Sequence, residues 1–195
     1  SFSKMSKHDF DQTFLYLYND YIKANKTNWL SADEVIKYKK DAENIERLMV
    51  GKTAPDVQLF NRDNTPVQLS DINAKMNLLI FWSPDCSHCK KEMPIVKKLF
   101  AEYQSKGLAV TAVCAKKTEQ LPSCFEFEDK TQFPTEWYVL NDGSFKSKFH
   151  ILYDCSSFPR IYILDENEKI LFRRRGEVTE SEFRSVFDKI LKTHN

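Results

Sequence analysis

The chain has 195 residues, of which 42% are hydrophobic and 13% aromatic, so it is long and apolar enough to bury a core. Its 29 basic and 28 acidic side chains leave a net charge of +1, which gives no electrostatic case for binding nucleic acid. The longest apolar run, residues 78–82, is far too short to cross a bilayer.

The first fifty residues have the spacing of two helices. Aromatic and aliphatic side chains recur at helical intervals over residues 10–22. Ser31 and Glu34 form a capping box that predicts the start of a second amphipathic helix. The helical pattern then breaks at a proline-containing segment. We therefore predict a two-helix extension over residues 1–51 and a separate domain over residues 52–195.

From residue 57 onward, strand and helix patterns alternate. The expected strands cover residues 57–60, 66–69, 75–82, 108–114, 137–140, 160–165 and 169–175. The expected helices cover residues 86–104, 145–153 and 179–191, with a polar, partly helical stretch over 118–130. Continuous apolar strands between helices indicate an α/β fold, in which a central mixed β-sheet is flanked by helices and has an antiparallel hairpin at one edge.

The clearest chemical signal joins the 75–82 strand to the following helix. This segment reads Phe81-Trp82-Ser83-Pro84-Asp85-Cys86-Ser87-His88-Cys89-Lys90-Lys91. Cys86 lies at the expected helix start, where unpaired backbone N–H groups and the positive end of the helix dipole favour a thiolate over a thiol. Because the thiolate is the nucleophile of disulfide exchange, Cys86 and Cys89 are predicted to form a redox-active pair.

The other three cysteines offer no second close pair, so a zinc site is disfavoured and no metal is expected. Cys114 and Cys155 are expected to be free and to pack as small hydrophobic residues. A disulfide between Cys124 and either of them is the alternative, which spacing alone leaves open.

Several separated motifs carry a family resemblance. They are Ala54-Pro55-Asp56, Leu69-Ser70-Asp71-Ile72, Phe81-Trp82 followed by Cys86, Cys89-Lys90, Glu92 and Pro94, and finally Phe158-Pro159. Together, over about residues 52–193, they resemble the thioredoxin-like family of TlpA and ResA type, which is related to AhpC/TSA proteins. The resemblance implies a thioredoxin fold and a thiol-disulfide oxidoreductase. It also implies a periplasmic or cell-envelope location, in which the full-length protein is either tethered to the membrane or soluble. The N-terminal helices resemble the tail of an accessory domain that precedes this module in some members.

By this resemblance, Cys86 attacks a protein disulfide and Cys89 resolves the mixed disulfide. Pro159 matches the family's cis-proline, which faces the cysteine pair and presents backbone to an extended substrate. Trp82 and Pro84 are expected to support the site. The implied partners are a protein disulfide substrate and an upstream thiol electron donor, which could be embedded in a membrane. No cofactor is expected beyond the redox-active disulfide itself.

Three further residues bear on the chemistry. His88, when protonated, would stabilise the Cys86 thiolate and make the disulfide a better oxidant, or it is a solvated histidine with little effect. The first reading favours oxidation, whereas the family favours reduction, and reduction is our prediction. Thioredoxin has a buried aspartate where this chain has Ile80, and Glu92 is expected to point away from the cysteines.

Two other classes of function stay open. A thiol peroxidase would use Ser83, three residues before Cys86, but would want a proline where Leu79 stands. A non-catalytic binding or metal-carrying module would use residues 1–50 as a docking surface. The redox pair at a predicted helix start favours the oxidoreductase over both.

Overall fold

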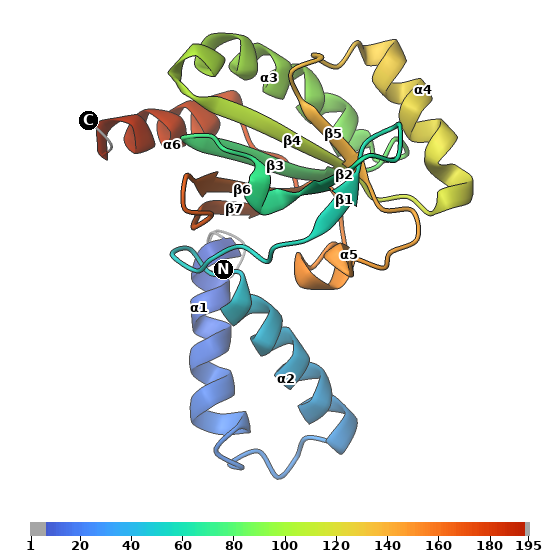
Figure 1. The fold of residues 1–195 in the computed structure, drawn as a ribbon. Helices are drawn as coiled ribbons and strands as arrows, with labels where there is room; N and C mark the ends of the chain where they lie inside the picture. Colours follow the sequence, from blue (N-terminus) through green and yellow to red (C-terminus); the bar gives the residue numbers. More distant parts are fainter. Residues whose placement is uncertain (1–6, 194–195) are drawn as a thin grey trace. The chain divides into compact units, whose positions relative to one another are not determined.

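The computed structural model describes residues 7–193 and divides into two compact units, with the division between Met49 and Val50 (Figure 1). The first unit contains α1 (Lys7–Leu17), a π-helical turn (Tyr18–Ile22) and α2 (Ala32–Arg47). The predicted two-helix extension is therefore confirmed. No helix within residues 7–193 combines the length and hydrophobicity needed to cross a membrane.

The start of α2 is set by the predicted capping box. The Ser31 hydroxyl oxygen accepts a hydrogen bond from the Glu34 backbone N–H at 3.3 Å, and the Glu34 carboxylate accepts one from the Ser31 backbone N–H at 2.8 Å. Two backbone donors that the helix itself cannot satisfy are thus paired. The rings of Phe14 and Tyr38 then pack edge to face, with centroids 6.2 Å apart, and join the two helices of this unit.

The second unit is built on a seven-stranded mixed sheet in the order β2-β1-β5-β4-β3-β6-β7. The strands are β1 (Gln58–Phe60), β2 (Pro66–Gln68), β3 (Met76–Trp82), β4 (Leu108–Cys114), β5 (Tyr138–Asn141), β6 (Arg160–Asp165) and β7 (Ile170–Arg175). The helices are α3 (Ser87–Tyr103), α4 (Leu121–Thr131), α5 (Phe149–Leu152) and α6 (Glu180–Thr193). β3, β4 and β5 are parallel, and the other pairings are antiparallel. The predicted mixed sheet with flanking helices is confirmed, and so is the hairpin at one edge.

β3 lies inside this sheet, between β4 and β6, and all seven of its residues are buried. Ile80 and Trp82 face the core formed with α3, α4 and α6. Phe81 faces the opposite side, where its ring stacks on Phe149 of α5 at 5.6 Å between centroids. A strand buried on both faces needs a continuous apolar run, which is the pattern that the sequence shows.

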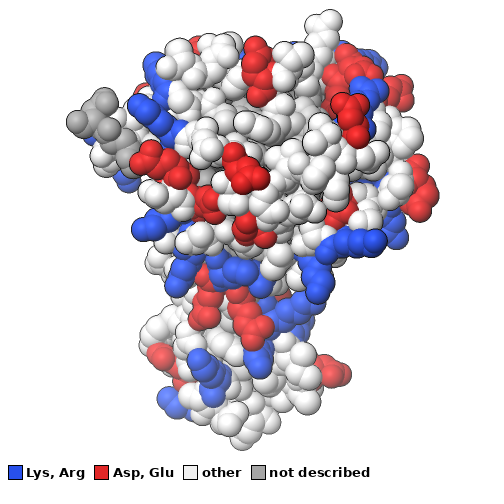
Figure 2. All heavy atoms as spheres, in the orientation of Figure 1, with Lys and Arg blue, Asp and Glu red and all other residues white. Residues whose placement is uncertain are grey.

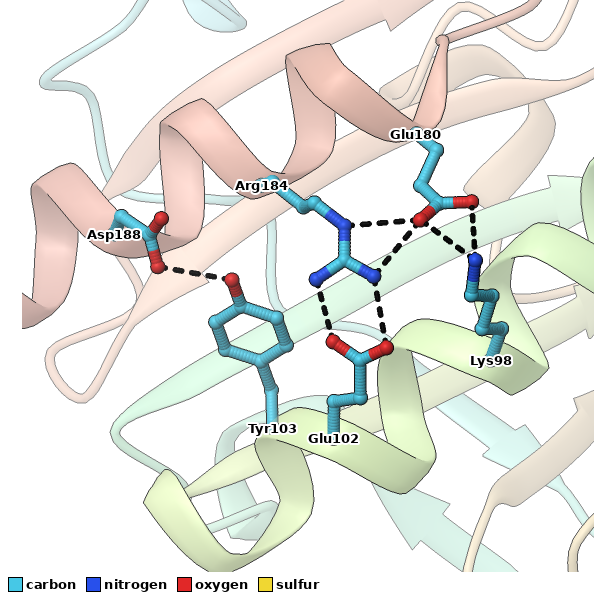
Figure 3. Close-up of polar contacts among 6 residues, drawn as sticks. All are labelled: Lys98, Glu102, Tyr103, Glu180, Arg184 and Asp188. Carbon is cyan, nitrogen blue, oxygen red and sulfur yellow. Dashed lines mark hydrogen bonds and ion pairs between the residues drawn. The ribbon is translucent and has the colours of Figure 1, made fainter.

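The C-terminal half of α3 is fastened to α6 (Figure 3). The Arg184 guanidinium donates hydrogen bonds to Glu102 on α3 and to Glu180 on its own helix. Lys98 Nζ donates to Glu180 Oε1 at 2.9 Å. The Tyr103 hydroxyl donates to Asp188 at 2.9 Å. These contacts hold the C-terminal half of α3 against α6.

The helix predicted over residues 145–153 is wrong in extent, since α5 is a single turn from Phe149 to Leu152. Phe145 and Lys148 both have positive φ, at 54° and 58°, which interrupts any helix. The Asp142 carboxylate accepts hydrogen bonds from the backbone N–H groups of Ser144 at 3.2 Å and Ser147 at 2.7 Å. This side chain stabilises a turn in place of the first helical turn.

Basic and acidic side chains are interspersed over the second unit on the face drawn in Figure 2. Several charges are paired between elements that lie far apart in the sequence. Arg62, in the turn between β1 and β2, is 2.7 Å from Asp129 of α4, and both side chains are more than half exposed. Pairs of this kind hold neighbouring elements in register but contribute little free energy each.

Candidate active site

Cys86 lies at the N-cap of α3, one residue before the helix begins. The turn that joins it to β3 is closed by a hydrogen bond from the Cys86 backbone N–H to the Ser83 carbonyl oxygen at 3.1 Å. The Cys86 sulfur in turn accepts a hydrogen bond from the Cys89 backbone N–H at 3.2 Å. This sulfur occupies the position at a helix N-terminus where a backbone donor and the helix dipole both favour negative charge.

The two cysteines of the pair differ in accessibility. Cys86 is partly exposed, whereas Cys89 is fully buried. Burial is the main reason why the pKa of Cys89 lies well above its usual range, and the hydrogen bond with Cys86 adds to the effect. The Cys86 sulfur is therefore partly open to solvent, whereas the Cys89 thiol is shielded from it.

The loop before β6 brings a backbone acceptor to Cys86 from 72 residues away. The peptide bond between Phe158 and Pro159 is cis, as the resemblance implies. The Cys86 thiol donates to the Phe158 carbonyl oxygen, with 3.4 Å between sulfur and oxygen. Phe158 itself is half-buried and packs against the core, and Pro159 is buried. Residues widely separated in sequence thus converge on one sulfur atom.

Glu92 corrects an expectation drawn from the sequence. It does not point away from the cysteines, since its side chain is 1% exposed and its charge helps to raise the pKa of Cys89. Its carboxylate accepts a weak hydrogen bond from the Val178 backbone N–H at 3.3 Å. Burial raises the pKa of Glu92 to about 7. Cys89, Glu92, Met93 and Val96 are all buried on α3 at helical spacing, a periodicity that could have placed Glu92 inside.

His88 is paired with a residue that sequence reasoning did not find. Its Nδ1 atom lies 2.6 Å from Glu177 Oε1, and Lys91 Nζ lies 3.8 Å from the same oxygen. The hydrogen bond with His88 is the main cause that holds the pKa of Glu177 below its usual range. All three side chains are about half exposed or more. Glu177 follows β7 and carries no local sequence signal.

The residues before Cys86 also have partners that lie far away in sequence. Trp82 is fully buried, and its ring packs against Phe127 of α4 at 5.1 Å between centroids. Pro84 is buried in the turn. Asp85, by contrast, is exposed and is contacted by Lys116, which comes shortly after β4. That contact is the main reason why the pKa of Asp85 is lowered.

Cys114 is joined to Cys124 by a disulfide, with 6.4 Å between their Cα atoms. The expectation that Cys114 is a free core cysteine is therefore wrong, and the alternative pairing with Cys124 is the one observed. Both residues are buried, and the bond connects the end of β4 to α4. Cys155 is free. Spacing alone could not choose between the pairings because it depends on how α4 packs back on the sheet.

Comparison with known proteins places this geometry in a family. Residues 50–173 match the model of the AhpC/TSA family. The chain belongs to the AhpC/TSA family. Among curated relatives of this family member, the thiol-disulfide oxidoreductase ResA of Oceanobacillus iheyensis is 33% identical over 165 residues, which cover 83% of this chain and 82% of the relative.

Solved structures show the same fold as this AhpC/TSA protein. A domain of a possible thiol-disulfide isomerase from Cytophaga hutchinsonii is 30% identical, with a TM-score of 0.63 over 75% of this chain and 97% of that one. A thioredoxin-like protein from Bacteroides caccae, 21% identical, matches 95% of this chain and 63% of that one with a TM-score of 0.71. The thioredoxin-like fold is confirmed, and this AhpC/TSA family member is a thiol-disulfide oxidoreductase.

Proposed function

We propose that this oxidoreductase reduces disulfide bonds in proteins, with Cys86 as the nucleophile and Cys89 as the resolving thiol. The observation that carries the proposal is the placement of the two sulfurs. Cys86 is accessible at the helix N-cap beside the Phe158 carbonyl, and Cys89 is buried directly behind it. This is the asymmetry that a two-step exchange requires, because only one thiol should meet the substrate.

In the first step, the Cys86 thiolate attacks one sulfur of the substrate disulfide. A bond forms between Cys86 and that sulfur, the substrate S–S bond breaks, and the second substrate sulfur leaves as a thiolate that takes up a proton. In the second step, Cys89 loses its proton and attacks the Cys86 sulfur, which releases the other substrate sulfur. The substrate gains two electrons, and the enzyme is left with a Cys86–Cys89 disulfide.

The surrounding residues have supporting roles in this scheme. The backbone next to Pro159 would pair with an extended substrate chain, as the Phe158 carbonyl already lies beside Cys86. Trp82 and Pro84, both buried, hold the turn that carries Cys86. We infer that Glu92 assists Cys89, because a buried carboxyl with a pKa near neutrality can exchange a proton at working pH. His88 favours the Cys86 thiolate when it is charged, and Glu177 opposes that effect.

The proposed function also implies an electron donor and a cellular location. The cycle needs an upstream thiol donor, which we expect to act on the oxidised Cys86–Cys89 pair and which could lie in the membrane. We expect the enzyme to work in the periplasm or cell envelope, tethered to the membrane in the full-length protein. The Cys114–Cys124 disulfide supports an oxidising compartment of this kind, since such bonds are rare in reducing ones.

The Cys89→Ser variant is expected to trap a protein substrate as a mixed disulfide with Cys86. Without the resolving thiol the second step cannot occur, so the complex persists until an added thiol releases it. The measurement is non-reducing electrophoresis after incubation with insulin whose disulfide bonds are intact, together with peptide mapping of the linked cysteine.

The matched control is Cys86→Ser, which should form no adduct and should lose at least about a thousandfold of the insulin-reducing rate. If Cys86→Ser traps substrate through Cys89 instead, the assigned roles are reversed. If neither variant forms an adduct and the wild-type protein does not reduce insulin, a non-catalytic module becomes the better description.

The reduction potential of the Cys86–Cys89 pair tests the direction of the reaction. A value near that of thioredoxin, about −270 mV, is expected for a reductase. A value of about −120 mV would instead show a strongly stabilised thiolate and an oxidant. The measurement is equilibration with glutathione or dithiothreitol, followed by quantification of the alkylated pair.

A further inference from the structure

A lysine outside the cysteine motif contacts the residue immediately before Cys86. Lys116 Nζ donates a hydrogen bond to Asp85 Oδ2, and the two residues are 31 positions apart in sequence. The Lys116 side chain is only 16% exposed, whereas that of Asp85 is 74% exposed. Most of the Lys116 side chain is therefore covered by the surrounding protein, whereas the Asp85 side chain lies on the solvent side.

The position of Lys116 is set by the end of β4. Cys114, the last residue of that strand, lies opposite Trp82 in the parallel register of β3 and β4. The Ala115 backbone N–H then donates to the Trp82 carbonyl oxygen at 2.9 Å. The disulfide to Cys124 fastens the same point to α4. Lys116 thus leaves the sheet from a segment that is bonded both to the strand before the motif and to the neighbouring helix.

The chemistry of Cys86 gives this contact a consequence. A carboxylate next to a thiol opposes ionisation of that thiol, because the two negative charges repel each other. We propose that Lys116 is a positioning residue that neutralises Asp85 and thereby favours the Cys86 thiolate. This rests on the proposed role of Cys86 as the nucleophile.

Other charged groups lie on α3 and on the two segments that contact the cysteine motif through Cys86 and His88. On α3, the charge of Lys90 also lowers the pKa of Asp85, although less than Lys116 does. Lys91, on the same helix, belongs to the cluster of His88 and Glu177. Glu177 precedes α6 and pairs with His88. Cys89 and Glu92 are buried behind Cys86. On the loop before the cis-proline, Asp154 is paired with Arg160 and Arg175, and Cys155 is free. Glu177 and Asp154 have cationic partners of their own, and loss of Lys116 leaves Asp85 with only the weaker influence of Lys90.

The test is the pH dependence of Cys86 alkylation by iodoacetamide, with peptide mapping to identify the modified thiol. Lys116→Met is expected to move the alkylation midpoint to higher pH and to slow alkylation at pH 7 by about two- to fivefold. Lys116→Arg should keep the wild-type profile because it keeps the ion pair. The double variant Asp85→Asn with Lys116→Met should also return to the wild-type profile, since no unpaired charge is left.

Lys98→Met is the matched control, because it breaks a lysine–carboxylate pair between α3 and α6 without involving residues next to Cys86. It should leave the profile unchanged. The proposal is overturned if Lys116→Met has the profile of the wild type, or if the double variant stays as slow as Lys116→Met, which would indicate a structural effect without a charge effect. If Cys86 of the wild-type protein is not the thiol that reacts at neutral pH, the proposed function itself fails, and the peptide map distinguishes that result.

Discussion

Replacing Glu92 with glutamine is expected to stabilise the folded protein at pH 8 by about 3 kcal/mol and to leave its stability at pH 4 unchanged. Burial raises the pKa of this carboxyl from 4.5 to about 7 in the folded chain. The folded state therefore holds the proton more tightly than the unfolded state. The stability gained in this way is complete below about pH 4.5 and is lost as the pH rises to about 7. Glutamine removes the cost of a buried charge above that range, and its carbonyl can still accept from Val178.

The measurement is urea denaturation at both pH values, and the chain offers a matched control. Glu128 on α4 is also buried, and burial raises its pKa to about 7 as well. Glu128→Gln should therefore give a similar gain in stability at pH 8. Only Glu92→Gln should also change the pH dependence with which a substrate is released from its mixed disulfide, because Glu92 acts on Cys89. Identical release profiles in the two variants would show that Glu92 has no part in the exchange.

Removal of the Cys114–Cys124 cross-link is expected to lower the free energy of unfolding by about 3 kcal/mol. The bond closes a loop between residues 10 positions apart, and the restriction it places on the unfolded chain is worth roughly this amount for a loop of that size. The change is made as Cys114→Ala with Cys124→Ala. Removal of the cross-link is also expected to weaken the packing of α4 on the sheet, where the Phe127 ring contacts Trp82, and this lowers the stability further.

The measurement is best made in a chain that also carries Cys86→Ser and Cys89→Ser, so that the redox pair cannot exchange with the cross-link. Dithiothreitol should lower the denaturation midpoint of that chain but not that of the chain lacking all four cysteines. Cys155→Ala serves as a control, since Cys155 is a free cysteine that makes no cross-link. Equal midpoints with and without dithiothreitol would mean that Cys114 and Cys124 are not joined in solution.

The parts of the fold that could be predicted are those written in short stretches of sequence. The apolar run of β3 and the capping box at Ser31 are local patterns, and both gave elements close to those observed. The cis bond before Pro159 came from a family resemblance and not from any local pattern. The prediction of a helix over residues 145–153 was wrong in extent because the Asp142 carboxylate accepts hydrogen bonds from two backbone N–H groups and stabilises a turn there.

The sequence predicted the positions of the two cysteines of the candidate site but not the charged residues that contact their neighbours. Cys86 and Cys89 are close in sequence, so their placement follows from a single turn. The contacts of His88 with Glu177 and of Asp85 with Lys116 span 89 and 31 residues. Contacts of this range depend on how strands align in the sheet, which no spacing rule reveals. The electrostatic surroundings of the cysteines therefore had to come from the structure.

The burial of the Cys114–Cys124 disulfide affects which reductants can react with it. Cys114 and Cys124 are 1% and 0% exposed, whereas Cys86 is open to solvent on one side. Exchange requires a thiolate to reach a sulfur directly, so we expect a protein thiol donor to react at Cys86 and to be sterically excluded from the cross-link. Under the proposed cycle, the Cys86–Cys89 pair would follow the redox conditions under which the enzyme works, turnover after turnover. The buried pair would instead keep the oxidation state in which it formed when the chain folded.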